Sequence, residues 1–368
     1  MILNLNKIKS RLAILHNIPK YFFKRIESAT AFGEDLFPSW SNTVYVNTML
    51  KVKFENVYNI YKSLQSKSDR DMIIEAFENT NKVELLCQND RYVRMLTIND
   101  LPESIRDSID RLFEYLYNTA TKYPHFIQYT NSSLNQVVDR FISNHKIEVC
   151  PFCGLEAFIN VDGQSRLAMD HWLCRDLFPF AAVNFNNLIP VGDKCNGRPA
   201  KGSLNVLESR DHVGERAVAY YPYATHHGVT GKFLFIKEPN IGNTEDGDWS
   251  FTFSPNDMTE LPIFNSWDKT LNISTRYIDY VKKNVLNMWE TDYKAFIEDS
   301  TFTHAQTLAE FKVNLQNWMG AFPIARRVGS IAYRSFINYL LNEASESYLT
   351  GLYKMFYSEY HYSLLNQP

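Results

Sequence analysis

The segment between Cys150 and Gly202 limits what this chain can fold into more than any other part of the sequence. It gathers cysteine, histidine, aspartate and asparagine, the residue types that hold metal ions, at short spacings. In chain order it contains a C-x-x-C pair (Cys150, Cys153), β-like runs at residues 155–161 and 166–169, Asp170-His171, an aromatic loop (Phe178, Pro179, Phe180), Asn187-Leu188-Ile189-Pro190, Cys195-Asn196 and Lys201-Gly202. Each motif alone is common, but this order within one short segment predicts a small metal-binding finger.

Asp170, His171 and Asn196 are the candidate catalytic residues, because together they supply a base and two oxygen ligands. Hydrolysis of a phosphodiester near neutral pH needs a hydroxide-like nucleophile, and a neutral imidazole held by a backbone carbonyl can generate one from water. We therefore expect His171 to act as the general base. Neighbouring strand residues point to opposite sides, so Asp170 can bind a cation while His171 faces the water. Asn196 offers a second oxygen, and one carboxylate with one amide suits Mg²⁺ or Mn²⁺.

Further polar residues complete the expected site. Asn187 is expected to act as a clamp, because its amide can bond backbone groups across the loop at residues 174–186 and so orient His171. Three basic residues close to Asn196 in the sequence are expected to contact the phosphate groups of a nucleic acid. These residues are Lys194, Arg198 and Lys201.

These motifs resemble the HNH endonuclease family, also called the ββα-metal or His-Me finger family, over about residues 148–202. The run Met169-Asp-His-Trp-Leu, followed by Phe178-Pro179 and Asn187-Leu-Ile-Pro, looks especially like the zinc-stapled branch of bacterial defence and restriction proteins. The resemblance implies a ββα finger in which Asp170 and Asn196 bind the catalytic ion, His171 is the base and Asn187 is the middle asparagine. It also implies DNA as the substrate, and control by a regulatory protein partner or by homo-oligomerisation.

The zinc staple of that branch is incomplete in this sequence. The branch usually has a second C-x-x-C before the closing asparagine, but here the first position of that pair is Gly192 and only Cys195 remains. Structural zinc strongly prefers four protein ligands, and Cys150, Cys153 and Cys195 supply three. A fourth ligand would have to be Asp193 or a histidine such as His145 or His212, while Cys174 is expected to be a buried thiol. Whether the chain binds one structural zinc ion therefore stays an open question.

The rest of the chain predicts helical flanks and a small β section, so the expected class is α+β: mainly α, with the embedded ββα-metal (HNH) finger. The expected divisions are a helical scaffold at 1–146, the finger at 147–205, a β-rich section at 206–270 and a helical region at 271–368. Helices are expected at residues 8–29, 68–86, 104–123, 131–142, 277–296, 308–319, 329–341 and 345–360. Strands are expected at residues 216–223, 231–236 and 249–253.

Composition limits how the protein can bind nucleic acid and in which cellular compartment we expect it. A formal net charge of −3 argues against coating of nucleic acid by bulk attraction, so DNA binding would need a local basic patch. The chain has no secretory signal pattern and no apolar run long enough for a bilayer, which predicts no membrane association. Five cysteines in 368 residues suit metal ligation in a reducing cytoplasm better than a disulfide framework.

Two alternative functions stay open from the sequence. A non-catalytic zinc-finger-like module that binds nucleic acid or protein would need the cysteines, but neither Asp170-His171 nor Asn196. A ribonuclease built on the same finger would use the same active site, so the site residues alone do not separate DNA from RNA.

Overall fold

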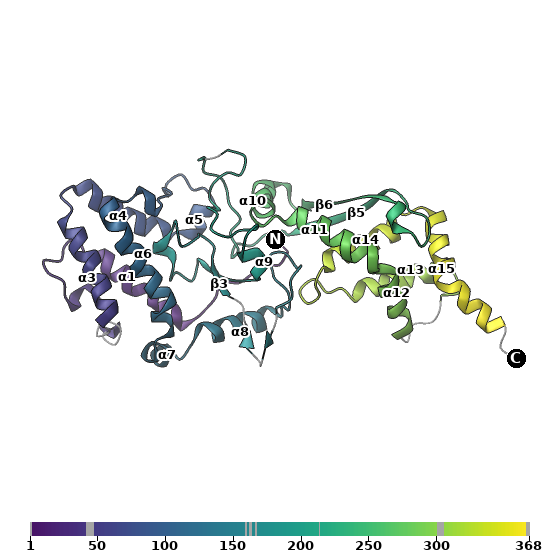
Figure 1. The fold of residues 1–368 in the computed structure, drawn as a ribbon, viewed down its shortest axis with the longest axis horizontal. Helices are drawn as coiled ribbons and strands as arrows, with labels where there is room; N and C mark the ends of the chain where they lie inside the picture. Colours follow the sequence, from purple (N-terminus) through teal and green to yellow (C-terminus); the bar gives the residue numbers. More distant parts are fainter. Residues whose placement is uncertain are drawn as a thin grey trace.

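The protein is described here from a computed structural model that covers residues 2–41, 48–158, 160–161, 164–165, 168–212, 214–299 and 305–365. Its shape is elongated, with helices at both ends and the β3 region between them (Figure 1). The described residues are mainly helical and form three two-stranded antiparallel sheets. The expected mainly helical α+β class is therefore confirmed. Among these residues, no helix combines the length and apolar character that crossing a bilayer requires.

Helices make up most of the chain before the finger, as expected. They are η1 (Arg11–His16), α1 (Asn17–Arg25), η2 (Glu34–Leu36), η3 (Ser39–Ser41), α3 (Thr48–Ser63), α4 (Lys67–Thr80), α5 (Val83–Cys87), η4 (Ile98–Asp100), α6 (Glu103–Asn118), η5 (Ala120–Lys122), α7 (Pro124–Thr130) and α8 (Leu134–His145). The first helical segment starts at Arg11 rather than residue 8, and Pro19 lies in the first turn of α1, where its missing N–H leaves no bond unmade. The sequence patterns did not single out α3 or α7.

The central hairpin carries the Asp170-His171 pair. Strand β3 (Ala168–His171) pairs antiparallel with β4 (Leu188–Val191), so that His171 lies opposite Leu188. The one-turn helix α9 (Asp193–Asn196) follows directly. The order is thus strand, long loop with η6 (Pro179–Ala181), strand and short helix.

The two strands expected at 155–161 and 166–169 are confirmed only in part. From the run 155–161, only Asn160–Val161 forms a strand, β1, which pairs with β2 (Gln164–Ser165); Ile159 lies outside the described residues. The residues before it close a tight turn, in which the Cys150 N–H donates to the Glu156 carbonyl at 2.8 Å. Of the run 166–169, residues 166 and 167 lie outside the described residues, and β3 continues through His171.

After the finger, β5 (Val229–Lys237) and β6 (Asp248–Pro255) form a long hairpin, which confirms the strands expected at 231–236 and 249–253. The strand expected at 216–223 is wrong. Its backbone makes isolated hydrogen bonds to separate segments and does not pair continuously with one strand. The Ala219 N–H donates to the Cys87 carbonyl at 2.8 Å, and the Tyr220 N–H donates to the Ser266 hydroxyl at 3.1 Å.

The remainder is helical. It comprises η7 (Thr244–Asp246), η8 (Met258–Glu260), α10 (Leu261–Leu271), α11 (Ile273–Tyr280), the π-helical segment η9 (Val281–Leu286), α12 (Asn287–Asp299), α13 (Leu308–Gly320), α14 (Ser330–Asn342) and α15 (Glu346–Leu365). The single helix expected at 277–296 is thus α11, η9 and α12 in succession. The helices expected at 308–319, 329–341 and 345–360 correspond to α13, α14 and α15.

Two hydrophobic cores meet at the central hairpin. One core joins the N-terminal helices and takes Met169 and Leu188 from the hairpin. The other joins the β5–β6 hairpin and the C-terminal helices, and takes Ile189 and Val191. Strand β4 is buried at all four positions because it has a core on each face. The boundaries expected at 146, 205 and 270 stay predictions.

Candidate active site and cysteine cluster

The predicted site residues Asp170, His171 and Asn196 line one cavity of about 360 Å³ at the end of the central hairpin. Asp170 and His171 come from β3, and Asn196 comes from the last position of α9. Lys201 lines the same cavity, on the loop that follows α9. The structure therefore brings together residues that the sequence separates by up to 31 positions.

The ring of His171 is fixed on two sides. Its Nε2 lies 3.0 Å from the carbonyl oxygen of Ala182, and the ring makes a T-shaped contact with Tyr117, with the ring centroids 4.4 Å apart. Because a carbonyl only accepts, Nε2 carries the hydrogen and Nδ1 keeps the lone pair in the neutral ring. Burial lowers the pKa of His171 from 6.5 to about 4, so the ring is neutral at pH 7. A neutral ring with a free lone pair is what a general base needs.

Asn187 has the clamp geometry expected from the sequence. Its side chain is fully buried, and its Oδ1 accepts the Leu173 N–H at 2.7 Å. Its Nδ2 donates to the carbonyl of Leu173 at 3.1 Å and to that of Ala181 at 3.4 Å. These bonds tie the residues directly after His171 to the part of the loop that presents the Ala182 carbonyl. The amide thus acts on His171 through the backbone and does not line the cavity.

Asp170 and Lys201 form a buried ion pair in the cavity wall. The Lys201 Nζ lies 2.9 Å from the Asp170 Oδ2, and the side chains are 2% and 11% exposed. Burial raises the pKa of Asp170, and the charge of Lys201 acts in the opposite direction. The ammonium group that the sequence assigned to phosphate contact is therefore already the counter-ion of the predicted metal ligand.

The other expected basic residues lie beside the cavity rather than in its wall. Lys194 on α9 and Arg198 on the following loop are both exposed. Sequence reasoning missed five residues that do line it: Tyr117 of α6, Arg175, and also Asn118, Asp176 and Ser203. Tyr117 lies within the helix expected at 104–123, and no motif singled it out; its hydroxyl also donates to the Met169 carbonyl at 2.7 Å. No sequence signal separated Arg175 from other surface arginines.

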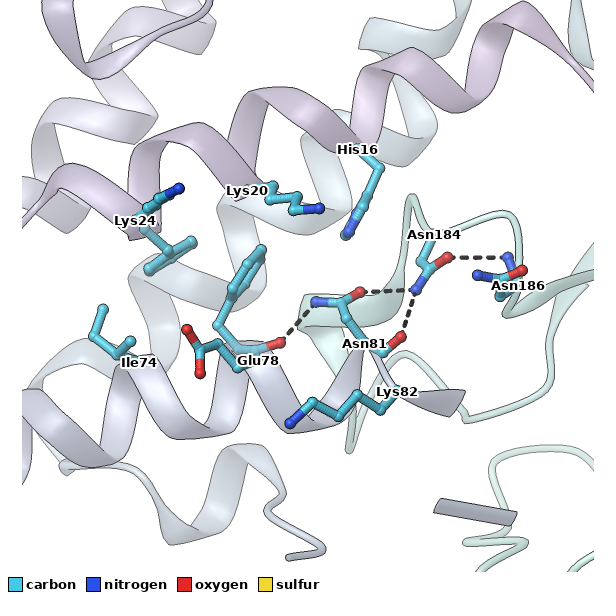
Figure 2. A pocket seen from close by; sticks show the side chains of 11 residues that line it. His16, Lys20, Lys24, Ile74, Glu78, Asn81, Lys82, Asn184 and Asn186 are labelled. Atoms are coloured by element: carbon cyan, nitrogen blue, oxygen red, sulfur yellow. Dashed lines mark hydrogen bonds between the residues drawn. The ribbon is translucent and has the colours of Figure 1, made fainter. Parts of the chain in front are cut away.

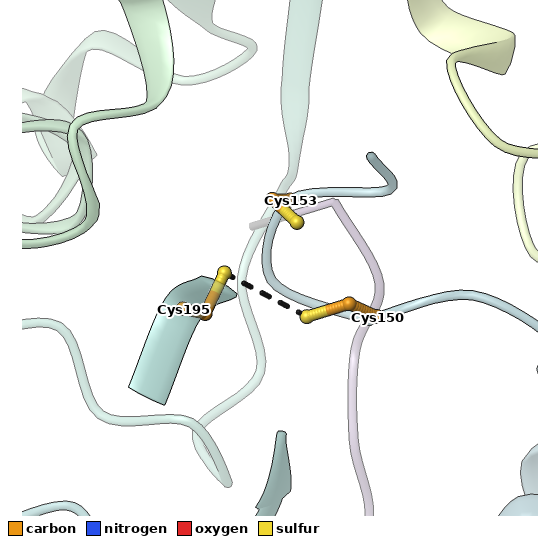
Figure 3. Close-up of side chains that lie close together, drawn as sticks. All are labelled: Cys150, Cys153 and Cys195. Atoms are coloured by element: carbon orange, nitrogen blue, oxygen red, sulfur yellow. Dashed lines mark hydrogen bonds between the residues drawn. The ribbon is translucent and has the colours of Figure 1, made fainter. Parts of the chain in front are cut away.

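The three cysteines Cys150, Cys153 and Cys195 form a second, buried cluster that could hold a metal ion such as zinc. Figure 3 shows their sulfur atoms turned toward a common space between a turn and the short helix α9. The three sulfurs lie within 4.8 Å of one another, and those of Cys150 and Cys195 are 3.8 Å apart. That distance is too long for a disulfide, at about 2 Å. It is close to the ~3.8 Å edge of a tetrahedron with Zn–S bonds of about 2.3 Å.

Neighbouring N–H groups donate hydrogen bonds to these sulfurs. The Leu155 N–H donates to the Cys153 sulfur at 3.4 Å, in a turn where Gly154 has a φ of +62°. The guanidinium of Arg276, on α11, donates to the sulfurs of Cys195 and Cys153 at 3.2 and 3.4 Å. Such N–H donors to sulfur are typical of the groups that surround a thiolate metal site.

None of the three fourth ligands expected from the sequence joins this cluster among the described residues. His145 uses both ring nitrogens elsewhere: Nδ1 donates to the Phe141 carbonyl at 2.8 Å and Nε2 accepts the Asn6 N–H at 2.9 Å. Asp193 and His212 are exposed. Cys174 is buried, as expected, and lines the cavity with His171 instead.

A larger cavity of about 510 Å³ lies on the other side of the loop that holds His171. Figure 2 shows His16 and Lys20 pointing toward Asn81, which contacts Asn184 of the loop. The Asn184 Nδ2 donates to the Asn81 Oδ1 at 3.0 Å, and the Asn187 N–H donates to the Asn184 carbonyl at 2.8 Å. This cavity is also lined by a histidine and a carboxylate, His16 and Glu78, but by none of the residues of the Asp170-His171 and Asn196 motifs, so we place the candidate active site in the smaller one.

Comparisons of the chain with protein-family models, with curated proteins and with solved structures found no match. The function is therefore inferred from the motifs and from the geometry of the two sites.

We predict that Asn187→Ala lowers the free energy of unfolding by about 1–3 kcal/mol, because it leaves the buried N–H and carbonyl of Leu173 without their partner. Denaturant unfolding monitored by tryptophan fluorescence measures the change. The matched control is Asn186→Ala, an exposed neighbour, which should change stability by less than about 0.5 kcal/mol. Equal effects of the two substitutions would show that the amide is not a clamp.

We predict that His16→Phe removes part of the acid sensitivity of the fold. Burial, with a smaller contribution from Lys20, lowers the pKa of His16 from 6.5 to about 4. The unfolded chain therefore binds the extra proton between these values, and stability is lost as the pH falls from 6.5 toward 4. Between pH 7 and pH 5, wild type should lose about 2 kcal/mol more than the variant. Phenylalanine keeps the stacking on Phe77, and parallel pH curves for both proteins would contradict the assignment.

Proposed function

We propose that this chain is a metal-dependent HNH endonuclease that hydrolyses phosphodiester bonds in DNA, as a restriction or defence effector. The observation that carries the proposal is the shared cavity of Asp170, His171 and Asn196, in which the ring of His171 is neutral and fixed. The strand–loop–strand–helix order of β3, β4 and α9 supports it, because the family that the sequence resembles uses that order. A module that only binds zinc would gain nothing from a buried, clamped histidine.

The donor set of the cavity fits a divalent cation. The Asp170 carboxylate and the Asn196 amide are hard oxygen donors, and both line the cavity. They would hold Mg²⁺ or Mn²⁺, whose chemistry is to neutralise charge on the phosphate and on the leaving 3′ oxygen. Because the Asp170 Oδ2 is paired with Lys201, Oδ1 is the oxygen available without breaking the ion pair.

The protein's own residues then account for nucleophile activation. The lone pair on Nδ1 of His171 takes a proton from a water molecule as its oxygen bonds to phosphorus, and the bond to the 3′ oxygen breaks. The Ala182 carbonyl and the Tyr117 ring keep the imidazole in one orientation, so no reorganisation accompanies the proton transfer. Lys201 and Arg175 also line the cavity, and both can donate hydrogen bonds to a bound phosphate. In the described structure their charges are paired, Lys201 with Asp170 and Arg175 with Glu114 and Asp176.

We predict that His171→Ala lowers the cleavage rate by about 10²–10⁴, the usual contribution of a general base, while DNA affinity stays within a few-fold. EDTA should stop wild-type cleavage, and Mg²⁺ or Mn²⁺ should restore it. Plasmid, linear duplex, single-stranded DNA and RNA are tested side by side, with thermal unfolding of each variant. The control is His125→Ala, an exposed histidine on α7. Wild-type rates in His171→Ala or in EDTA would refute the mechanism, and cleavage of RNA alone would make the chain a ribonuclease.

We predict that Lys194→Glu and Arg198→Glu weaken DNA binding and reduce its salt dependence by about one unit of log–log slope for each lost phosphate contact. Both residues are exposed beside the cavity, so their substitution leaves the buried Asp170–Lys201 pair intact. Fluorescence anisotropy over a salt series measures the slope, and Lys237→Glu on β5 is the exposed control. Unchanged slopes in both variants would place the DNA surface elsewhere.

A further inference from the structure

The cysteine cluster has three sulfurs, whereas a structural zinc site needs four protein ligands. We propose that the carboxylate of Glu156 is the fourth ligand, so that the ion is held by three thiolates and one carboxylate. Zinc accepts both ligand types, with Zn–O bonds of about 2.0–2.2 Å. This inference concerns metal binding alone and stands whether or not the chain cleaves DNA.

The first observation is the space beside Gly192, the residue just before α9. A Cβ on Gly192 would lie 3.2 Å from the Cβ of Cys150 and 2.3 Å from the Oε2 of Glu156. A side chain at position 192 would thus start next to Cys150, and the Glu156 carboxylate takes up that room. The Glu156 side chain, which comes from the facing turn, therefore occupies the space that a side chain at position 192 would take.

The second observation is that Glu156 is tied to both segments that carry the sulfurs. Its carbonyl accepts the Cys150 N–H at 2.8 Å, which closes the turn of the C-x-x-C pair. Its Oε2 accepts the N–H of Lys194 at 3.0 Å, one residue before Cys195 on α9. These two bonds place the Glu156 side chain beside both segments that carry the sulfurs.

A cation beside the sulfurs offsets part of the charge that such a ligand set would carry. Three thiolates and a carboxylate around Zn²⁺ carry a net charge of about −2, which is costly to bury without a nearby cation. Arg276 supplies one, with its guanidinium on the sulfurs of Cys153 and Cys195. In the described structure only the three sulfurs lie within 4.8 Å of one another, so ligation requires the Glu156 side chain to rotate toward them.

The first experiment measures zinc in the full-length protein. Wild type should hold about one zinc ion per chain by elemental analysis. In competition with a chromophoric chelator, Glu156→Gln should weaken zinc affinity by at least about tenfold, the lower end of what even outer-shell changes cost. The matched control is Asp193→Asn, which removes the nearest carboxylate expected from the sequence and should leave affinity unchanged. The proposal is overturned if Glu156→Gln binds zinc with unchanged affinity. It is also overturned if wild-type protein with its cysteines in the reduced thiol form contains no zinc.

The second experiment restores the site by a different ligand. Gly192 has an ordinary backbone conformation (φ −71°, ψ 150°), so with the carboxylate gone a cysteine there needs only a small shift away from the Cys150 Cβ at 3.2 Å. The double variant Glu156→Ala/Gly192→Cys should therefore recover zinc affinity that Glu156→Ala loses. With Co²⁺ in place of zinc, the thiolate-to-metal absorption should report three sulfurs in wild type and four in the double variant. Four sulfurs in wild type, or no recovery in a folded double variant, excludes Glu156 as the ligand.

Discussion

Burial of the β3–β4 hairpin on both faces is the constraint on which the rest of the structure depends. Met169 and Leu188 pack into the N-terminal core, while Ile189 and Val191 pack into the other core. A two-stranded hairpin alone is marginal in water, so these contacts hold its register. A slip of one residue would exchange the faces of both strands and bury the wrong side chains. The positions of Asp170 and His171 at the end of β3 are thus fixed by packing on both sides.

The buried polar groups of the candidate site are stable because each has a partner. The N–H and carbonyl of Leu173 bond to Asn187, the His171 ring bonds to the Ala182 carbonyl, and Asp170 pairs with Lys201. Without Lys201, the carboxylate of Asp170 would be a buried charge with no counter-ion, which is strongly destabilising. The ion pair therefore lets the chain fold with a carboxylate in the cavity wall before any cation binds there.

The sequence correctly predicted that Asp170, His171 and Asn196 lie together, because all three line one cavity, while their catalytic roles stay predictions. Asp170, His171 and Asn196 were assigned from residue order alone, because the chemistry of a metal-bound hydrolytic site requires these types at close spacing. The long helices were predictable because an apolar stripe, as in α6, fixes the buried face. The segment at 216–223 has strand-like composition, but its backbone bonds reach two distant segments, at Cys87 and Ser266, that periodicity cannot reveal. Tyr117 was missed for a similar reason. The helical pattern shows on which face of α6 it lies, but it does not show that this side chain contacts His171.

The cysteine cluster and the candidate active site are mechanically one unit, because Cys195 and Asn196 are consecutive residues of α9. A helix of a single turn is not stable on its own, so its position must come from tertiary contacts. Cys195 lies against Cys150 and Arg276, which belong to the turn before the hairpin and to α11. Asn196 in turn reaches the cavity of Asp170 and His171. A metal ion on the sulfurs would therefore set the distance between the two oxygen ligands of the proposed catalytic cation, while lying outside their cavity.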